Sequence, residues 1–231
     1  MSKPVALVTG ASSGIGRVIV ADLAATHEVI GLGRDTERLA NCGANTTLSA
    51  DLSDVAVFAE GGSVYELVSQ LPRLDALVHS AAVGTPGWFA DTDTAEWQRQ
   101  MSTNVIAPAA LTRLALPLLR ASKGTVVFIG SGVSIRPARQ MSVYVATKHA
   151  LKGMADSLRL EVEPDAIRVA TILPGQVATP MQVELQDGIG GNYTPDRYIQ
   201  PSSVAGAVRF AVDAPAEVQI TDLMVRPRPV R

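Results

Sequence analysis

Cysteine is nearly absent from this sequence, as are an excess of charge of either sign and a long uninterrupted apolar run. Each absence excludes a class of protein. One cysteine, Cys42, occurs in 231 residues, so an internal disulfide is excluded and we expect a reducing compartment, the cytoplasm. Neither sign of charge dominates, because 20 basic residues face 22 acidic ones. A nucleic-acid-binding domain is usually strongly basic, so we expect no nucleic-acid partner. The longest apolar run, 105–119, contains Thr112, Arg113 and two prolines, whereas a membrane span needs about 18 uninterrupted apolar residues, so we expect no membrane partner.

Aromatic residues are also few, at 4%, although hydrophobic residues make up 47% of the chain. Ala, Val, Leu and Ile carry the apolar share, and such side chains suit strands buried on both faces beneath closely packed helices. No internal repeat or linker-like tract divides the sequence. At roughly 100–200 residues per domain, we expect residues 1–231 to form a single domain.

Short apolar runs alternate with stretches of helical spacing along the chain. The runs are mostly continuous, which is typical of strands buried on both faces. Strands that alternate with helices favour a parallel sheet with right-handed crossovers and helices on both faces. The predicted strands are residues 5–8, 29–32, 46–50, 76–78, 126–129, 169–173 and 218–225. The predicted helices are residues 15–24, 64–70, 93–119 and about 142–163, and residues 179–201 are expected to form a loop that acts as a short substrate lid around 180–200.

A glycine-rich turn follows the first predicted strand. Glycines let a backbone turn tightly and approach a ligand closely, and the helix that follows presents free N–H groups and its positive dipole end to a phosphate. The spacing differs from the Gly-x-Gly-x-x-Gly dinucleotide fingerprint and lacks the Gly-Lys-Ser/Thr of a nucleoside-triphosphate loop. The turn alone therefore leaves both a phosphate site and a structural turn open. Its candidate cofactor-binding residues are Gly10, Ser12, Ser13, Gly14, Ile15 and Gly16.

A second group of residues favours the phosphate site. Ser131 follows the fifth predicted strand, and the sequence Tyr-Val-Ala-Thr-Lys places Tyr144 and Lys148 on the helix beyond it. Tyr-x-x-x-Lys alone is a weak signal, but in order with Ser131 and Thr-Gly-x-x-x-Gly-Ile-Gly it resembles the short-chain dehydrogenase/reductase family over nearly the whole chain. The resemblance implies a single Rossmann-type doubly wound α/β domain of about seven mostly parallel strands with helices on both faces. It also implies an oxidoreductase that transfers a hydride between a nicotinamide cofactor and a small-molecule carbonyl or alcohol.

The resemblance assigns roles to four candidate catalytic residues. Tyr144 and Lys148 are four residues apart and so share a helix face, and an ammonium is expected to lower the pKa of a nearby phenol from its usual value of about 10. Tyr144 is implied as general acid in reduction and base in oxidation. Lys148 is implied to lower that pKa and to hold the nicotinamide ribose, and Ser131 to hydrogen-bond the substrate oxygen. Asn104 is implied to support a water that links Lys148 to solvent.

Further cofactor contacts follow from the resemblance. Asp51 and Leu52 look like the pair whose aspartate contacts the adenine, after the third predicted strand. After the sixth predicted strand, the chain resembles the family segment that holds the nicotinamide end of the cofactor. Its residues here are Pro174, Gly175, Val177 and Thr179.

One position departs from the family pattern. Where many relatives carry Asn-Asn-Ala-Gly, this chain has His79, Ser80, Ala81 and Ala82. We expect the backbone of residues 80–82 to keep its contact with the cofactor. His79 is interpreted as a buried residue with its own hydrogen-bond partner rather than as a catalytic acid.

The end of the second predicted strand bears on the choice of cofactor. An acidic residue there binds the ribose 2′-hydroxyl of NAD, whereas an arginine accommodates the 2′-phosphate of NADP. The family's aspartate position falls on Gly33, and Arg34 follows it. Arg34 as a solvated surface charge is the alternative, and the adjacent Asp35 leaves NAD(H) possible. We expect NADP(H) to be preferred.

Other functions remain open beside carbonyl reduction. A protein of this fold can bind the cofactor as a regulator without turnover, or act as an epimerase or dehydratase with a resident nicotinamide, because fold alone does not decide function. The family resemblance also implies a homodimer or homotetramer. No metal site is expected.

Overall fold

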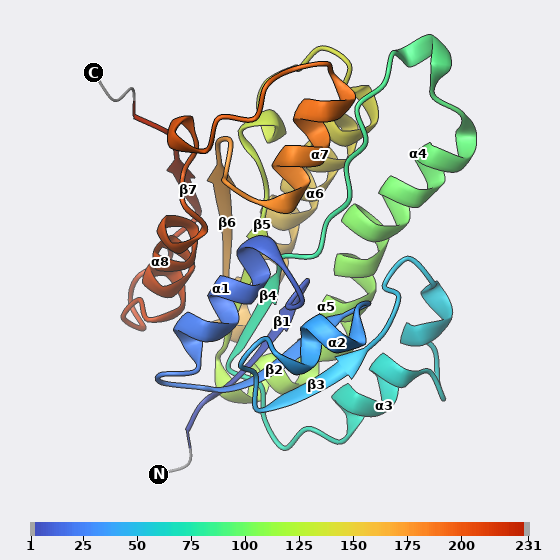
Figure 1. Cartoon of the computed structure of the whole chain (residues 1–231). Helices are drawn as coiled ribbons and strands as arrows, with labels where there is room; N and C mark the ends of the chain where they lie inside the picture. The colour runs from blue at the N-terminus through green and yellow to red at the C-terminus, as the bar shows by residue number, and fades with distance from the viewer. Residues whose placement is uncertain (1–2, 229–231) are drawn as a thin grey trace.

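The computed structural model describes residues 3–228 and contains a seven-stranded sheet (Figure 1). Its strands are β1 (Val5–Thr9), β2 (Glu28–Gly33), β3 (Thr46–Ser49), β4 (Ala76–His79), β5 (Thr125–Ile129), β6 (Arg168–Pro174) and β7 (Asp222–Val225). They pair in the order β3-β2-β1-β4-β5-β6-β7, and each pair is parallel. The predicted doubly wound α/β fold is confirmed, with all rather than most of these strands parallel.

Helices cover both faces of the sheet. They are α1 (Gly14–Leu23), α2 (Thr36–Ala40), α3 (Ser63–Ser69), α4 (Thr94–Met101), α5 (Ala107–Ser122), α6 (Ser142–Val162), α7 (Pro180–Gly188) and α8 (Pro201–Val212). β1 shows how alternate residues serve the two faces. Ala6 and Val8 belong to a core that includes α1 and α8, whereas Val5 and Leu7 belong to a second core that includes α3, α5 and α6. Both cores are built mainly of small and branched aliphatic side chains, in keeping with the low aromatic content.

The direction of winding reverses between β1 and β4, which lie side by side in the sheet. From β1 the chain continues to β2 and β3 on one side, and from β4 it continues to β5, β6 and β7 on the other. Such a reversal leaves a crevice outside the carboxyl ends of the two central strands, where open α/β sheets bind ligands. The glycine turn follows β1 and residues 80–82 follow β4, so both candidate segments lie at this crevice.

The helix predicted over residues 93–119 is built from three consecutive segments. α4 is followed by a π-helical turn, Ser102–Ile106, and then by α5. Asp93 caps α4 by accepting a hydrogen bond from the backbone N–H of Glu96 at 2.8 Å. π-Helical turns are rare and often occur at functional sites, and this one carries Asn104.

The same stretch bears on the prediction about membranes. Within residues 3–228, Thr94–Ser122 is the one helical stretch long and apolar enough to span a bilayer by length and composition. Leu111, Ala115 and Leu119 of this stretch are buried in the core that lies against the sheet. Its apolar side is therefore used, at least in part, for packing within the domain.

Residues 179–201, predicted to be a loop, contain a helix, so that prediction is wrong in part. α7 occupies residues 180–188, and a 3₁₀ turn follows at Pro195–Arg197. The local cause is at the start of the helix, where Thr179 accepts a hydrogen bond from the N–H of Gln182 and Pro180 occupies the first helical position. Both features favour helix initiation.

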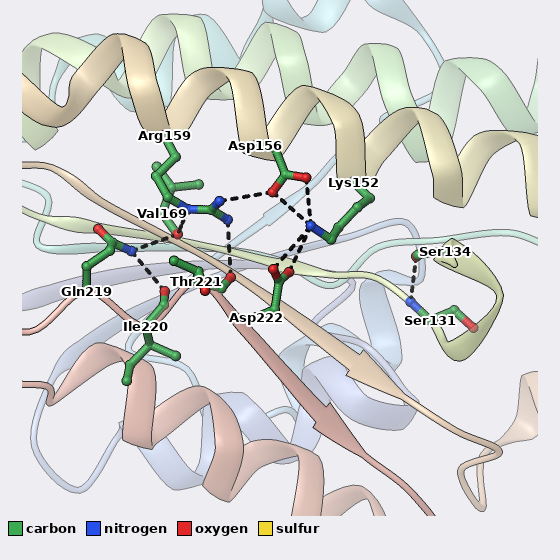
Figure 2. Close-up of polar contacts among 10 residues, drawn as sticks. All are labelled: Ser131, Ser134, Lys152, Asp156, Arg159, Val169, Gln219, Ile220, Thr221 and Asp222. Carbon is green, nitrogen blue, oxygen red and sulfur yellow. Dashed lines mark hydrogen bonds and ion pairs between the residues drawn. The ribbon is translucent and has the colours of Figure 1, made fainter. Parts of the chain in front are cut away.

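The strand predicted over residues 218–225 is wrong in its first half. Only its second half forms a strand, β7, which pairs with β6. Side chains take over where the backbone pairing stops (Figure 2). The carbonyl of Val169 accepts hydrogen bonds from Arg159 Nε and Gln219 Nε2, both at 2.9 Å. Arg159 also donates to the carbonyl of Thr221 at 3.2 Å. The carbonyl of Val169 on β6 therefore has hydrogen-bond partners without a neighbouring strand. The segment before β7 can leave the sheet at this point.

A second cation extends this contact along the same face of α6. Lys152 Nζ lies 2.6 Å from Asp156 and 3.1 Å from Asp222 on β7, as Figure 2 shows. Lys152 is one helical turn beyond Lys148. The network therefore fixes α6, which carries the candidate catalytic pair, against the edge of the sheet.

We expect Arg159→Met to lower the free energy of unfolding by about 2 kcal/mol, because it removes charged hydrogen bonds to two backbone carbonyls and leaves Asp156 with one fewer partner. Methionine keeps most of the aliphatic packing. Urea unfolding measures the change, with Arg113→Met at an exposed position on α5 as the control. Equal losses of stability in the two variants would contradict this account.

Candidate active site

The glycine turn passes directly against the segment that follows β4. Gly10 has a φ of +70°, and a Cβ placed on it would lie 2.9 Å from the backbone of Ala81. A side chain is therefore excluded at Gly10 by both conformation and space. From the other side, Thr9 Oγ1 accepts hydrogen bonds from the N–H groups of Ser80 and Ala81 at 3.1 and 3.0 Å. These contacts place the two candidate segments together at the crevice.

The start of α1 is open to an anionic ligand. Ser13 occupies the N-cap position, but its side chain makes no capping hydrogen bond, and the first turn carries no acidic residue. The first N–H groups of a helix, here beginning at Gly14, Ile15 and Gly16, lack acceptors within the helix. Together with the positive end of the helix dipole they suit a phosphate group. The predicted residues of the turn thus fit a cofactor that carries a pyrophosphate.

Tyr144 and Lys148 lie together on α6, as their spacing predicts. Lys148 Nζ is 5.6 Å from the centroid of the Tyr144 ring and donates a hydrogen bond to the carbonyl of Ile129, at the end of β5, at 2.9 Å. Only 2% of Lys148 is exposed to solvent. A buried lysine with a backbone carbonyl partner is held in one position, which is what an electrostatic role beside the tyrosine requires.

The protonation of this pair differs from the expectation. Burial raises the pKa of Tyr144 to about 12, with Ser131 within hydrogen-bonding reach acting in the opposite direction. Burial also lowers the pKa of Lys148 to about 8. The pKa of Tyr144 is therefore raised rather than lowered as expected, because desolvation disfavours the phenolate. At neutral pH Tyr144 holds its proton and Lys148 is mostly charged.

Ser131 lies where β5 ends and a short turn, Gly132–Ser134, begins. It is the N-cap of that turn: its Oγ accepts from the N–H of Val133 at 3.3 Å, and its own N–H donates to Ser134 Oγ at 3.1 Å. The second of these contacts is visible in Figure 2. The reciprocal hydrogen bonds hold the Ser131 backbone in place next to Tyr144.

Asn104 is buried in the π-helical turn, and its side chain is fully used. Its Oδ1 accepts from the N–H of Val83 at 2.8 Å, and its Nδ2 donates to the carbonyl of Val83 at 2.8 Å and to Thr147 Oγ1 at 3.0 Å. Thr147 adjoins Lys148 in the chain. The side chain of Asn104 thus joins the loop after β4 to α6, and a water beside Lys148 stays a prediction.

The end of β2 places the residues proposed to select the cofactor. Arg34 is exposed. The pKa of Asp51 is lowered mainly by hydrogen bonds from Ser53 and to a smaller extent by the positive charge of Arg34, so the two side chains lie near each other. Asp35 turns away to cap α2, where it accepts from the N–H of Arg38 at 2.9 Å. Asp35 is thus engaged in the helix cap, while Arg34 faces solvent beside the sequence-predicted adenine contact.

The remaining predicted contacts lie around the same edge of the sheet. Pro174 ends β6, and a Cβ on Gly14 would be 3.5 Å from Thr179 Cγ2, so the segment after β6 returns to the glycine turn. Ser12 lies against Gly33, since a Cβ on Gly33 would be 3.0 Å from its Oγ. Leu52, Ala82, Gly175 and Val177 follow β3, β4 and β6 at this edge, and Leu52 and Val177 are buried.

His79 has a structural environment, as predicted. It is 3% exposed, its Nε2 is 2.8 Å from Thr112 Oγ1, and its ring stacks on Phe128 with centroids 4.8 Å apart. Burial lowers the pKa of His79 to about 3. The ring is therefore neutral in the folded protein and is not poised to exchange protons near pH 7.

This burial predicts a dependence of stability on pH. The unfolded chain protonates His79 below about pH 6.5, but the folded protein does not until about pH 3, so stability falls as the pH drops between these values. We expect His79→Asn to have a lower free energy of unfolding than the parent at pH 7. The difference between the two proteins should be smaller by about 2 kcal/mol at pH 5. Urea unfolding at both pH values measures it, with His149→Asn on the exposed face of α6 as control. If the difference in the free energy of unfolding between parent and His79→Asn were the same at both pH values, His79 would not be held neutral by burial.

Two residues at the site have no role in the sequence-based prediction. Thr9 ties β1 to residues 80 and 81, and Gly84 lies against the Tyr144 ring. The only sequence signal for Thr9 is its place before Gly10 in the turn. For Gly84 there is none, because the contact joins residues 60 positions apart. Among residues 3–228 no group of three or more His, Cys, Asp or Glu side chains is arranged to hold a metal ion.

Comparison with known proteins gives a consistent assignment. The family model for short chain dehydrogenase matches residues 4–190. An uncharacterized short-chain type dehydrogenase/reductase from Sinorhizobium fredii is 32% identical over 232 residues, which cover 96% of this chain and 91% of the relative. Among solved structures, the alcohol dehydrogenase of the archaeon Thermococcus sibiricus complexed with 5-hydroxy-NADP is 25% identical, with a TM-score of 0.85 and 99% of each chain covered. A variant of actinorhodin polyketide ketoreductase with NADPH is 26% identical, with a TM-score of 0.87 and 98% of each chain covered.

The family model spans most of the chain, from the start of β1 to beyond α7. Within that span lie the glycine turn, Ser131 and the Tyr144–Lys148 pair, in the order and at the sheet edge described above. This chain belongs to the short-chain dehydrogenase/reductase family of oxidoreductases.

Proposed function

We propose that the protein is an NADP(H)-dependent oxidoreductase that interconverts a small-molecule carbonyl and its alcohol, with Tyr144 as the general acid or base. One observation carries the proposal. A protonated, half-buried tyrosine lies beside a buried lysine and within reach of Ser131, at the end of the sheet where α1 presents its open N-terminus. The proposed proton donor, positive charge and phosphate site thus lie at the same end of the sheet.

The proposed chemistry follows from the charges that develop during reduction. NADPH, when bound, supplies the hydride. Tyr144 Oη donates its proton to the substrate oxygen, and Ser131 Oγ hydrogen-bonds the same oxygen as negative charge builds there. The charge on Lys148 stabilises the phenolate that remains, and Asn104 supports a water through which Lys148 communicates with solvent. In alcohol oxidation the same groups act in reverse.

The preference for NADP(H) over NAD(H) rests on Arg34. We expect its exposed guanidinium, directly after β2, to pair with a 2′-phosphate, whereas Asp35 is occupied by the α2 cap. The solved relatives described above carry 5-hydroxy-NADP and NADPH. We assign the adenine end to Asp51 and Leu52, the pyrophosphate to the glycine turn, and the nicotinamide end to the remaining predicted contacts, Ser80, Ala81, Ala82, Pro174, Gly175, Val177 and Thr179.

The proposal extends to the organisation of the whole chain. Residues 1–231 act as a single catalytic domain in the cytoplasm, without a nucleic-acid or membrane partner, as a homodimer or homotetramer. α7 and the turns after it, residues 180–200, serve as a short substrate lid, and α7 ends against the loop after β4, since a Cβ on Gly188 would be 2.5 Å from Pro86 Cγ. Residues 1–2 and 229–231 lie outside the described structure.

A turnover screen tests the proposed function. The purified protein is incubated with NADPH and a panel of aldehydes, ketones and keto esters, and NADPH oxidation is compared with alcohol formed. The proposal expects equal amounts of both for at least one substrate class. Turnover of substrate without net NADPH consumption would favour an epimerase or dehydratase. Cofactor binding without turnover of any panel member would favour a regulator.

A further inference from the structure

The loop after β4 forms a wall against the ring of Tyr144. A Cβ placed on Gly84 would lie 2.8 Å from Cδ2 and 3.1 Å from Cε2 of that ring. The backbone of Gly84 is therefore in direct contact with the tyrosine, and any larger residue would displace one of them. The position of the Tyr144 ring thus depends on where this loop is held.

Two side chains from one helical stretch hold the loop on either side of Gly84. Before it, the backbone of Val83 is bound at both its N–H and its carbonyl by Asn104, at 2.8 Å each. After it, Thr85 Oγ1 accepts a hydrogen bond from an Arg99 NH2 group at 2.8 Å. Asn104 belongs to the predicted catalytic set, whereas Arg99 belongs to no part of it.

Arg99 is itself held in place by an ion pair. Its Nε and NH2 groups donate to the two carboxylate oxygens of Glu96, both at 2.7 Å. Gln100, fully buried, donates to the same carboxylate at 2.6 Å. Hydrogen bonds from Arg99, Gln100 and Thr85 hold the pKa of Glu96 at about 2, so the pair stays charged at every working pH. Bidentate pairing fixes the plane of the guanidinium and so fixes the group that reaches Thr85.

We propose that Arg99 is a positioning residue for the general acid. Through its hydrogen bond to Thr85 it fixes Gly84 against the ring of Tyr144 and thereby sets the hydroxyl relative to Ser131. This inference rests on the proposed role of Tyr144. Misplacement of a reacting group by a fraction of an ångström weakens the catalytic step more than it weakens binding, because the reaction depends on alignment.

Thr85→Val tests the link, because it removes the acceptor of the Arg99 hydrogen bond at an exposed loop position. Glu96 also loses its contact with Thr85 but keeps both hydrogen bonds from Arg99. We expect kcat to fall about tenfold, with the KM for NADPH and the thermal midpoint unchanged. Thr85→Ser keeps the hydroxyl and should retain the parent kcat. The matched control is Thr92→Val, which removes a hydroxyl hydrogen-bonded to the carbonyl of Trp88 in the same loop but not to Arg99.

The outcomes separate this inference from the proposed function. A parent-like kcat in Thr85→Val, or an equal fall in Thr92→Val or Thr85→Ser, would overturn the positioning role. A Tyr144→Phe protein with full activity would instead overturn the function on which the role rests. Glu96→Gln, which weakens the hold on Arg99, should lower kcat in the same direction as Thr85→Val, and an unchanged kcat there would also count against the inference.

Discussion

Replacing Tyr144 with phenylalanine is expected to lower kcat for carbonyl reduction by about 10²–10⁴-fold, the usual contribution of a positioned general acid. Phenylalanine keeps the ring that packs against Gly84 and removes only the hydroxyl. Desolvation raises the pKa of this hydroxyl to about 12, so in the parent enzyme it carries a proton throughout the neutral range. The loss should therefore be one of proton donation rather than of folding or cofactor binding.

Steady-state kinetics with NADPH and a carbonyl substrate measure this effect, and cofactor fluorescence titration measures binding separately. The Kd for NADPH should stay at the parent value in Tyr144→Phe. Tyr65→Phe, which removes a hydroxyl from α3 outside the described site, is the control and should retain the parent kcat. If Tyr144→Phe turned over at the parent rate, Tyr144 would not be the acid.

Replacing Arg34 with alanine is expected to raise the KM for NADPH by about 10–100-fold, because a charge-assisted hydrogen bond is worth about 1.5–3 kcal/mol and about 1.4 kcal/mol is a factor of ten. The KM for NADH should stay unchanged, since NADH has no 2′-phosphate. We expect no change in NADH binding through Asp35 either, because its carboxylate is engaged in the α2 cap by the N–H of Arg38.

Comparison of kcat/KM for the two cofactors measures the change, and Arg38→Ala is the matched control. Arg38 is an exposed arginine of the same region that pairs with Asp35 at 3.1 Å. Equal losses with NADPH and NADH, or the same loss in Arg38→Ala, would show that Arg34 does not select the 2′-phosphate. A parent enzyme that prefers NADH would contradict the cofactor proposal outright.

The architecture was largely predictable from the sequence because its strands are buried on both faces. Continuous apolar runs such as 5–8 and 126–129 have few alternatives to central strands of a parallel sheet. The errors lie at the edges, where side chains rather than burial decide. The first half of 218–225 is apolar enough for a strand, yet Gln219 and Arg159 satisfy the acceptor on β6. α7 is set by its cap at Thr179 and by Pro180, which short-range periodicity does not detect.

The site was predictable to the extent that its residues form local motifs. Spacing along one helix brings Tyr144 and Lys148 together, and the turn after β1 must meet α1. The sign of the tyrosine pKa shift was not predictable, because it depends on how far the fold removes the phenol from water. The contact of Gly84 with the ring, and the Arg99–Thr85 link behind it, likewise join segments that only the fold brings together.

The central claim is that this chain carries a hydride from NADPH to a carbonyl carbon while Tyr144 protonates the oxygen. The most direct measurement uses NADPH that carries deuterium at both hydrogen positions of nicotinamide C4, followed by mass spectrometry of the product. The account predicts one deuterium on the carbinol carbon per NADPH oxidised, and a rate that falls with Tyr144→Phe. Alcohol product formed without deuterium on the carbinol carbon would contradict it.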